Sequence, residues 1–106
     1  MKLIHVLFFL IFTSNAFAYD FILDNIAYKI TSQNTVYVTS GGSPSGSITI
    51  PSNVNYNSKN YIVDSIGANS FKNIDPISSV SLHSGIKSIG NSAFYNCSKI
   101  TGINIP

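Results

Sequence analysis

The chain of 106 residues lacks arginine, glutamate and tryptophan, and charged residues make up only 9% of it. Its six cationic residues are lysines that stand singly, and its four acidic residues are aspartates. Scattered lysines do not form the basic stripe, interleaved with aromatics, that nucleic-acid binding needs. Paired carboxylates and clustered metal ligands are also absent. We therefore expect no enzyme, no metal, no cofactor and no nucleic-acid partner.

Long apolar runs are equally scarce, since the sequence has one, from Leu3 to Phe12. Lys2 precedes this run, and the small-x-small pattern Ala16-Phe17-Ala18 follows it. This order predicts a secretory signal peptide over residues 1–18, cleaved before Tyr19. An uncleaved anchor is the alternative, but a span needs roughly 20 apolar residues. We expect a secreted or cell-surface protein without a membrane span after cleavage.

What the sequence does contain is a repeat. Ser65-Ile66-Gly67, followed by Phe71, recurs twenty-three positions later as Ser88-Ile89-Gly90, followed by Phe94. The apolar pattern Ile77-x-x-Val80-x-Leu82 recurs at the same offset as Ile100-x-x-Ile103-x-Ile105. A fixed period of this length is typical of a solenoid, in which each unit stacks on a neighbour that is built alike.

An earlier partial copy of the strand pattern is Ile48-Thr49-Ile50-Pro51. The spacing from Ile50 to Leu82 exceeds one period by nine positions, which predicts an insertion between them. The alternating segments Val54-x-Tyr56 and Tyr61-x-Val63 flank polar turn residues 57–60. The pattern predicts that the insertion is a β-hairpin over residues 54–63.

Residues 88–106 resemble one nearly complete unit of the BspA-type leucine-rich repeats, a family of secreted and surface proteins. The resemblance implies a mostly β repeat solenoid, a right-handed superhelix with short helical turns. About two and a half units would fill residues 47–106. Within a unit we expect Ile89 to point into the core, Gly90 to allow a tight turn, Asn91 or Ser92 to cap a helical turn, and Phe94 to project inward as Phe71 does.

The segment between the signal peptide and the repeats, residues 19–46, has the pattern of a small antiparallel sheet. We expect strands over residues 26–30 and 35–39, followed by a Gly/Ser/Pro loop at residues 41–46. A solenoid exposes an apolar end, so we interpret this segment as an N-terminal β cap.

Cys97 is the single cysteine, so the chain can form no internal disulfide. With His83 it could make a nucleophile and a base. The resemblance instead places Cys97 in the repeat core as a small hydrophobe, and His83 at an exposed strand exit.

The remaining functional candidate is the outer face of the repeat strands, where small polar residues alternate with core residues. The expected binding face consists of Ser47, Thr49, Ser79, Ser81 and Asn104, with Gly102 beside Asn104. By resemblance, this face would serve protein or glycan recognition in an adhesion or interaction module. The alternative is a non-binding N-terminal or truncated piece of a longer solenoid with a structural role. Its open C-terminal end would favour self-association.

Overall fold

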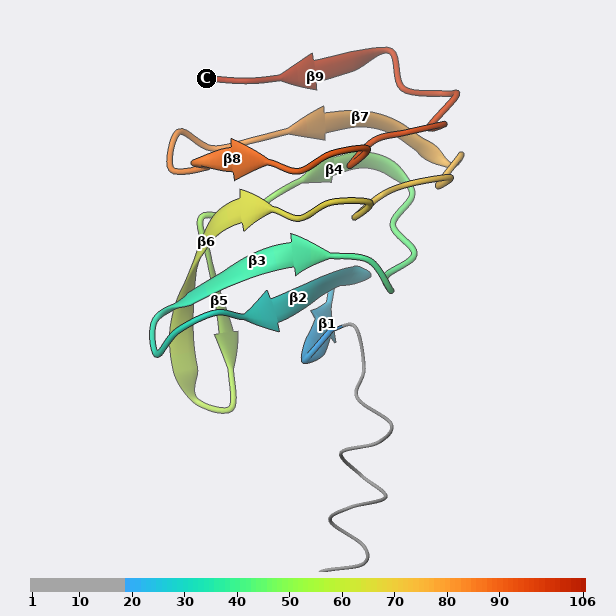
Figure 1. The fold of residues 1–106 in the computed structure, drawn as a ribbon. Helices are drawn as coiled ribbons and strands as arrows, with labels where there is room; N and C mark the ends of the chain where they lie inside the picture. Colours follow the sequence, from blue (N-terminus) through green and yellow to red (C-terminus); the bar gives the residue numbers. More distant parts are fainter. Residues whose placement is uncertain (1–18) are drawn as a thin grey trace, which may run out of the picture.

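The computed structural model describes residues 19–106, so the predicted signal peptide lies outside the described residues. The described chain forms nine strands, arranged in two sheets (Figure 1). The strands are β1 (Phe21–Leu23), β2 (Ile26–Ile30), β3 (Thr35–Thr39), β4 (Gly46–Thr49), β5 (Asn53–Tyr56), β6 (Lys59–Ile66), β7 (Ile77–Ser81), β8 (Ser88–Ile89) and β9 (Gly102–Asn104). One sheet has the order β1-β2-β3-β6-β5 with β8 also on β6, and the other has the order β4-β7-β9.

The N-terminal segment is antiparallel, and two of its strands, β2 and β3, have the predicted bounds. The predicted strands did not include β1, which pairs with β2 across a two-residue turn. Asp24 and Asn25 in this turn have φ values of 50° and 67°, as a type I′ turn requires. β3 then pairs in parallel with β6 and joins this segment to the repeats.

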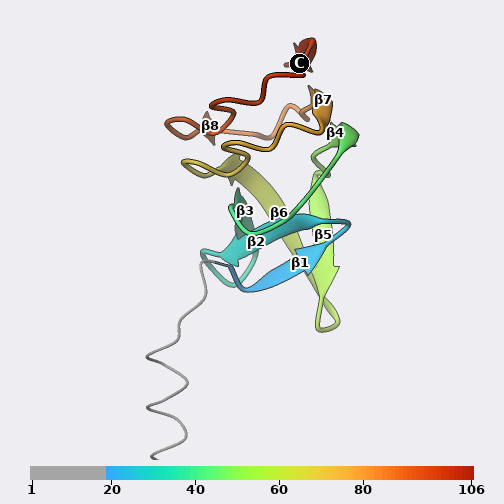
Figure 2. The same cartoon turned by 90° about the vertical axis from the view of Figure 1, so that its right-hand side faces the viewer.

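The predicted hairpin insertion is present as β5 and β6, which pair antiparallel. Its turn is shorter than expected, because Lys59 and Asn60 already belong to β6. Asn57 and Ser58 take left-handed φ values of 53° and 62° and close another I′-type turn. The hairpin extends away from β9, toward the end of the molecule where β1 lies (Figure 1 and Figure 2).

The repeats stack in the register that the sequence period predicts. In the parallel sheet, Val80 of β7 pairs with Ile103 of β9, one period later, and with Ile48 of β4 across the hairpin insertion. Ile66 of β6 pairs with Ile89 of β8 at the same period. Apolar side chains are therefore placed over one another along both sheets.

The prediction of short helical turns between the strands is wrong, because the described residues contain no helix. Each turn region is instead a chain of β-turns, such as Gly67–Ser70 and Phe71–Ile74, closed by backbone bonds. Residues with positive φ recur at the period of the repeat: Asn69 and Ser92, then Asn73 and Asn96. A positive φ is incompatible with a right-handed helix and fits the third position of a type II turn.

Neighbouring turn regions also hydrogen-bond to each other as strands do. The Phe71 N–H donates to the Ala93 carbonyl at 2.8 Å, and the Asn73 N–H donates to the Tyr95 carbonyl at 2.8 Å. Backbone pairing thus continues through the turns, which satisfies polar groups that a buried turn would otherwise leave without partners.

The repeated glycine has a different role from the one expected, since Gly90 does not adopt a left-handed φ. A Cβ at Gly90 would lie 2.3 Å from the Ala68 nitrogen of the preceding unit. A Cβ at Gly67 would lie 3.0 Å from the Val38 oxygen. Glycine recurs here because the backbones of successive units approach too closely for a side chain.

Equivalent core residues of successive units differ in their burial. Phe71 is 1% exposed, whereas Phe94, whose ring stacks on it with centroids 5.3 Å apart, is partly exposed. Ile66 lies between Val38 and Ile89 and is buried, while Ile89 itself is 42% exposed. Phe94 therefore projects inward and stacks on Phe71 as expected, but it is less buried than Phe71, and the core position expected for Ile89 is wrong. Within the described residues, each of the two has a stacked neighbour on one side alone.

Two buried polar groups complete the core. The Ser70 hydroxyl, which replaces Ala93 of the next unit, lies within bonding distance of the Val38 and Gly67 carbonyls at 2.9 and 2.6 Å. The Cys97 thiol is buried and donates to the Phe71 carbonyl at 2.8 Å. The core position expected for Cys97 is confirmed, and its thiol bridges two units.

Candidate binding surface

The five expected binding residues lie together on the outer face of the β4-β7-β9 sheet, whose strands are stacked one above another (Figure 1). Ser47, Ser79 and Gly102 form one row across the strands, and Thr49, Ser81 and Asn104 form the next. Because successive strand side chains alternate, the buried Ile48 and Val80 between these rows direct the polar groups outward. We call these six residues the hydroxyl strip.

The hydroxyl strip is uncharged and partly organised by its own contacts. The Ser79 hydroxyl donates to the Ser47 hydroxyl at 2.8 Å. Serine, threonine and asparagine side chains offer both donors and acceptors, so the strip can hydrogen-bond to neutral polar groups. Because the strip carries no charge, it does not attract charged ligands by long-range electrostatics.

A cavity of about 400 Å³ opens at the Thr49 end of the strip, where the β1–β2 turn faces the start of β5. Its apolar lining includes Leu23, Ile26 and Val54, and its polar lining includes Asp24, Thr49, Asn53 and Asn55. We call this cavity the Asp24 pocket. Sequence reasoning missed it, because its walls come from three segments that only the hairpin insertion and the N-terminal sheet bring together.

Tyr28 is one of the residues that line the Asp24 pocket, and it is buried. Burial, and secondarily the negative charge of Asp24, raises the pKa of Tyr28 from 10.0 to about 12. Both causes disfavour the phenolate, because one removes solvent and the other places an anion nearby.

The raised pKa of Tyr28 predicts alkaline destabilisation. The unfolded chain loses the Tyr28 proton near pH 10 and the folded chain near pH 12, so stability present below pH 10 is lost as the pH rises toward 12. We expect a loss of up to about 2 kcal/mol from this group, allowing for residual solvent screening. Denaturant titrations between pH 9 and 12 should show the loss in the wild type, the same loss in Tyr95→Phe and a smaller loss in Tyr28→Phe. An unchanged profile in Tyr28→Phe would contradict the assignment.

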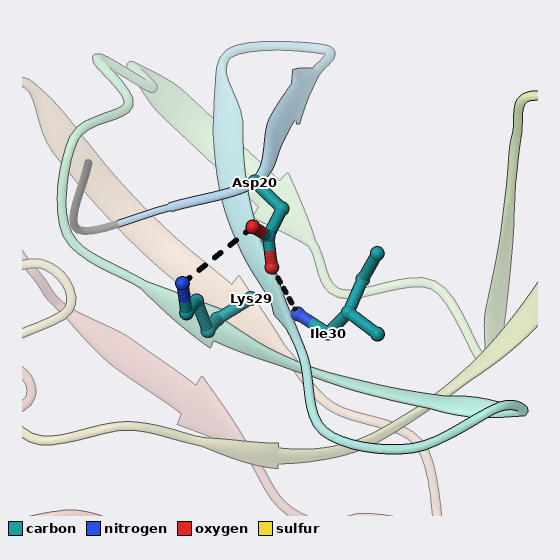
Figure 3. A network of polar contacts seen from close by, with 3 residues as sticks. All are labelled: Asp20, Lys29 and Ile30. Atoms are coloured by element: carbon teal, nitrogen blue, oxygen red, sulfur yellow. Dashed lines mark hydrogen bonds and ion pairs between the residues drawn. The ribbon is translucent and has the colours of Figure 1, made fainter. Parts of the chain in front are cut away.

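The N-terminal strands are held by a polar contact outside the hydroxyl strip and the Asp24 pocket. Asp20 accepts a hydrogen bond from the Ile30 N–H at 2.7 Å and pairs with the Lys29 ammonium at 3.5 Å (Figure 3). The pair is about a third exposed, so its charge interaction contributes little, and its role is to fix the entry of the chain into β1.

Side chains on the turn side form a second repeated surface that sequence reasoning did not single out. The Asn96 amide donates to the Asn73 side-chain oxygen at 3.0 Å, and the Ser98 hydroxyl donates to Asp75 at 3.1 Å. Tyr95 points outward as expected, 60% exposed, with the Lys72 ammonium 5.6 Å from its ring centroid. The two residues of each polar pair are separated in the sequence by one period of the repeat, and this separation was the sequence signal for the second surface.

Cys97 and His83, the two side chains considered as a nucleophile and a base, each form a hydrogen bond to the backbone instead. Cys97 bonds to a carbonyl as described above, and His83 accepts a hydrogen bond from the Gly85 N–H through Nδ1 at 3.0 Å. His83 is less exposed than expected, and its Nε2 is buried without a hydrogen-bond partner. Within residues 19–106, no group of three or more His, Cys, Asp or Glu side chains is placed to hold a metal ion. That part of the chain also has no helix of the length and apolar character that crossing a bilayer requires.

The repeating unit, its parallel strand ladder and its polar outer face define a leucine-rich repeat. A family model described as BspA type leucine rich repeat region (6 copies) matches residues 45–106. The chain belongs to this family, and the resemblance inferred from the sequence is confirmed.

Solved structures agree with this assignment. The chain is similar to a leucine-rich repeat protein from Bacteroides ovatus, with 36% identity and a TM-score of 0.72 over 83% of this chain and 24% of that one. It is also similar to a leucine-rich cell surface protein from Faecalibacterium prausnitzii, with 28% identity and a TM-score of 0.70 over 80% and 23% of the two chains. The chain thus spans about a quarter of the length of these structures. A search of curated proteins found no match.

Proposed function

We propose that this protein is a secreted or cell-surface interaction module that recognises a protein or a glycan through the hydroxyl strip. The observation that carries the proposal is the in-register placement of Ser47, Thr49, Ser79, Ser81 and Asn104 on one outer sheet face. This face is uncharged and continuous across three strands, and within it the Ser79 hydroxyl donates to the Ser47 hydroxyl. The name of the F. prausnitzii structure, a cell surface protein, supports the location.

Binding to a panel of purified extracellular proteins and glycans tests the strip. Ser81 lies in the central strand, so Ser81→Arg places a bulky cation in the middle of the strip without altering the core. We expect this variant to lose the partners that the wild type binds. Asn91→Arg, an equal change in charge on the exposed turn side, should keep them. Loss in Asn91→Arg with retention in Ser81→Arg would contradict the proposed face.

Export is a separate part of the proposal. Lys2, the apolar run and the Ala16-Phe17-Ala18 pattern support cleavage between Ala18 and Tyr19. N-terminal sequencing of the exported protein is expected to begin at Tyr19. Recovery of a chain that begins at Met1 or Lys2 from the membrane fraction would contradict it.

We also propose the finer architecture expected from the sequence, a right-handed leucine-rich repeat solenoid capped by residues 19–46. The parallel pairing of β3 with β6 supports it, because the N-terminal sheet continues the ladder that runs from Ile66 to Ile89. About two and a half units then occupy residues 47–106, with the hairpin as an insertion in the first.

A structural role is the second candidate, and the exposure of β8 and β9 favours it. Ile89, Ile103 and Ile105 are 42%, 40% and 66% exposed, and β9 is an edge strand. Apolar edge strands are templates for pairing with another chain, so these residues could join further repeats or a second copy. Light scattering tests this role: self-association that an appended repeat with a polar outer face abolishes would support it, and a monomer unchanged by the repeat would contradict it.

A further inference from the structure

We propose that the Asp24 pocket receives a lysine side chain from a protein partner, with the methylenes against its apolar lining and the ammonium at Asp24. The inference rests on the proposed function, since Thr49 belongs to both the pocket and the hydroxyl strip. It goes further by naming the partner's chemistry, a protein whose contact surface carries an accessible lysine.

The electrostatics of the pocket favour a cation. Asp24 is the one ionisable carboxyl group among the lining residues, and no lysine lines the cavity. Within residues 19–106, the ion pair formed is that of Lys29 with Asp20. Lys59 instead lies over the Tyr61 ring, 5.6 Å from its centroid. Asp24 thus lines the cavity, and within residues 19–106 it forms no ion pair with a lysine.

The pKa of Tyr28, which lines the same pocket, responds to the charge of Asp24. The charge of Asp24 contributes to raising that pKa, as described above. The same field that disfavours a phenolate at this position favours a cationic guest.

The shape and the neutral polar lining fit an ammonium on a flexible chain. Leu23, Ile26 and Val54 can cover methylenes, as happens where lysine buries its stem and keeps its charged end at a polar group. An ammonium has three donors. The Asp24 carboxylate can accept one, and the other polar residues that line the cavity, Thr49, Asn53 and Asn55, carry no cation that would compete with it.

Asp24→Asn is a suitable test variant because it removes the charge without disturbing the turn. Asp24 has a φ of 50°, a conformation in which asparagine is well tolerated. Asp75→Asn is the matched control, since Asp75 lies in the turn before β7 and bonds to Ser98, outside the pocket.

The experiment is an NMR titration of the ¹⁵N-labelled protein with Nα-acetyl-lysine methylamide as the probe. We expect saturable shifts at the Thr49, Asn53 and Asn55 amides, and binding weakened roughly tenfold in Asp24→Asn but unchanged in Asp75→Asn. The Nε-acetylated probe, which has no charge, should bind at least tenfold more weakly than the free amine.

Three results would overturn the lysine pocket: no saturable shift at these amides, equal binding of the Nε-acetylated probe, or equal weakening by Asp75→Asn. Tighter binding of the corresponding arginine amide would also overturn it in favour of a guanidinium site. These outcomes are distinguishable from failure of the proposed function, because the Ser81→Arg experiment does not depend on the probe or on Asp24.

Discussion

Phe71→Ala is expected to lower the free energy of unfolding by about 3–5 kcal/mol. Phe71 is 1% exposed, its ring stacks on Phe94, and its backbone bonds to Ala93 of the next unit. Truncation would leave a cavity in the middle of the stacked units, where the surrounding backbone ladders prevent collapse. Phe94→Ala should cost roughly half as much, because the Phe94 ring is already partly exposed.

Urea titrations of these variants, with Tyr95→Ala as the surface control, measure the predicted order. Tyr95 is 60% exposed, so its truncation should cost less than about 1 kcal/mol. Equal losses for Phe71→Ala and Phe94→Ala would mean that both ends of the ladder are covered in solution. Equal losses for Phe94→Ala and Tyr95→Ala would contradict the observed turn geometry.

Gly90→Ala is expected to destabilise the protein by about 3 kcal/mol, although it adds a single methyl group. The new Cβ would lie 2.3 Å from the Ala68 nitrogen and 2.7 Å from the Ala68 Cα. Both are backbone atoms of the preceding unit, so the two units would have to separate and weaken the Gly90–Ile66 hydrogen bond of 2.7 Å.

Gly102→Ala is the matched control, because a Cβ at Gly102 meets no atom within 4 Å. Thermal or denaturant unfolding should place this variant within about 0.5 kcal/mol of the wild type. A Gly90→Ala variant as stable as Gly102→Ala would show that close backbone approach is not the reason for the repeated glycine.

The sequence could predict the register of the stack because each repeat unit must bury its apolar residues against a neighbour of the same pattern. The constant offset between units therefore predicts from the sequence alone that Ile66 pairs with Ile89 and Val80 with Ile103. The departure from that offset after Ile50 located the hairpin for the same reason, since an insertion must leave the stack without shifting it. The positions of the hydroxyl strip follow directly from this register.

The turn regions could not be predicted in the same way. A period shows that Asn69 and Ser92 are equivalent, but not whether both take a helical or a left-handed φ. Glycine likewise signals a requirement for small size without saying whether a turn or a neighbouring backbone imposes it. The Asp24 pocket was also hidden, because Asp24, Thr49 and Asn53 meet only through the fold and share no sequence spacing.

In-register stacking of the strands builds the core and the hydroxyl strip together, and disulfide formation between strip positions measures this stacking directly. The hydroxyls of Ser47 and Ser79 are 2.8 Å apart, so the double variant Ser47→Cys/Ser79→Cys should form an intramolecular disulfide under mild oxidation. The out-of-register pair Thr49→Cys/Ser79→Cys should remain reduced. Cys97 is buried and should not compete. Mass spectrometry of non-reduced peptides should show the first link alone; ready formation of the second link, or failure of the first in the folded protein, would contradict the register and with it the strip.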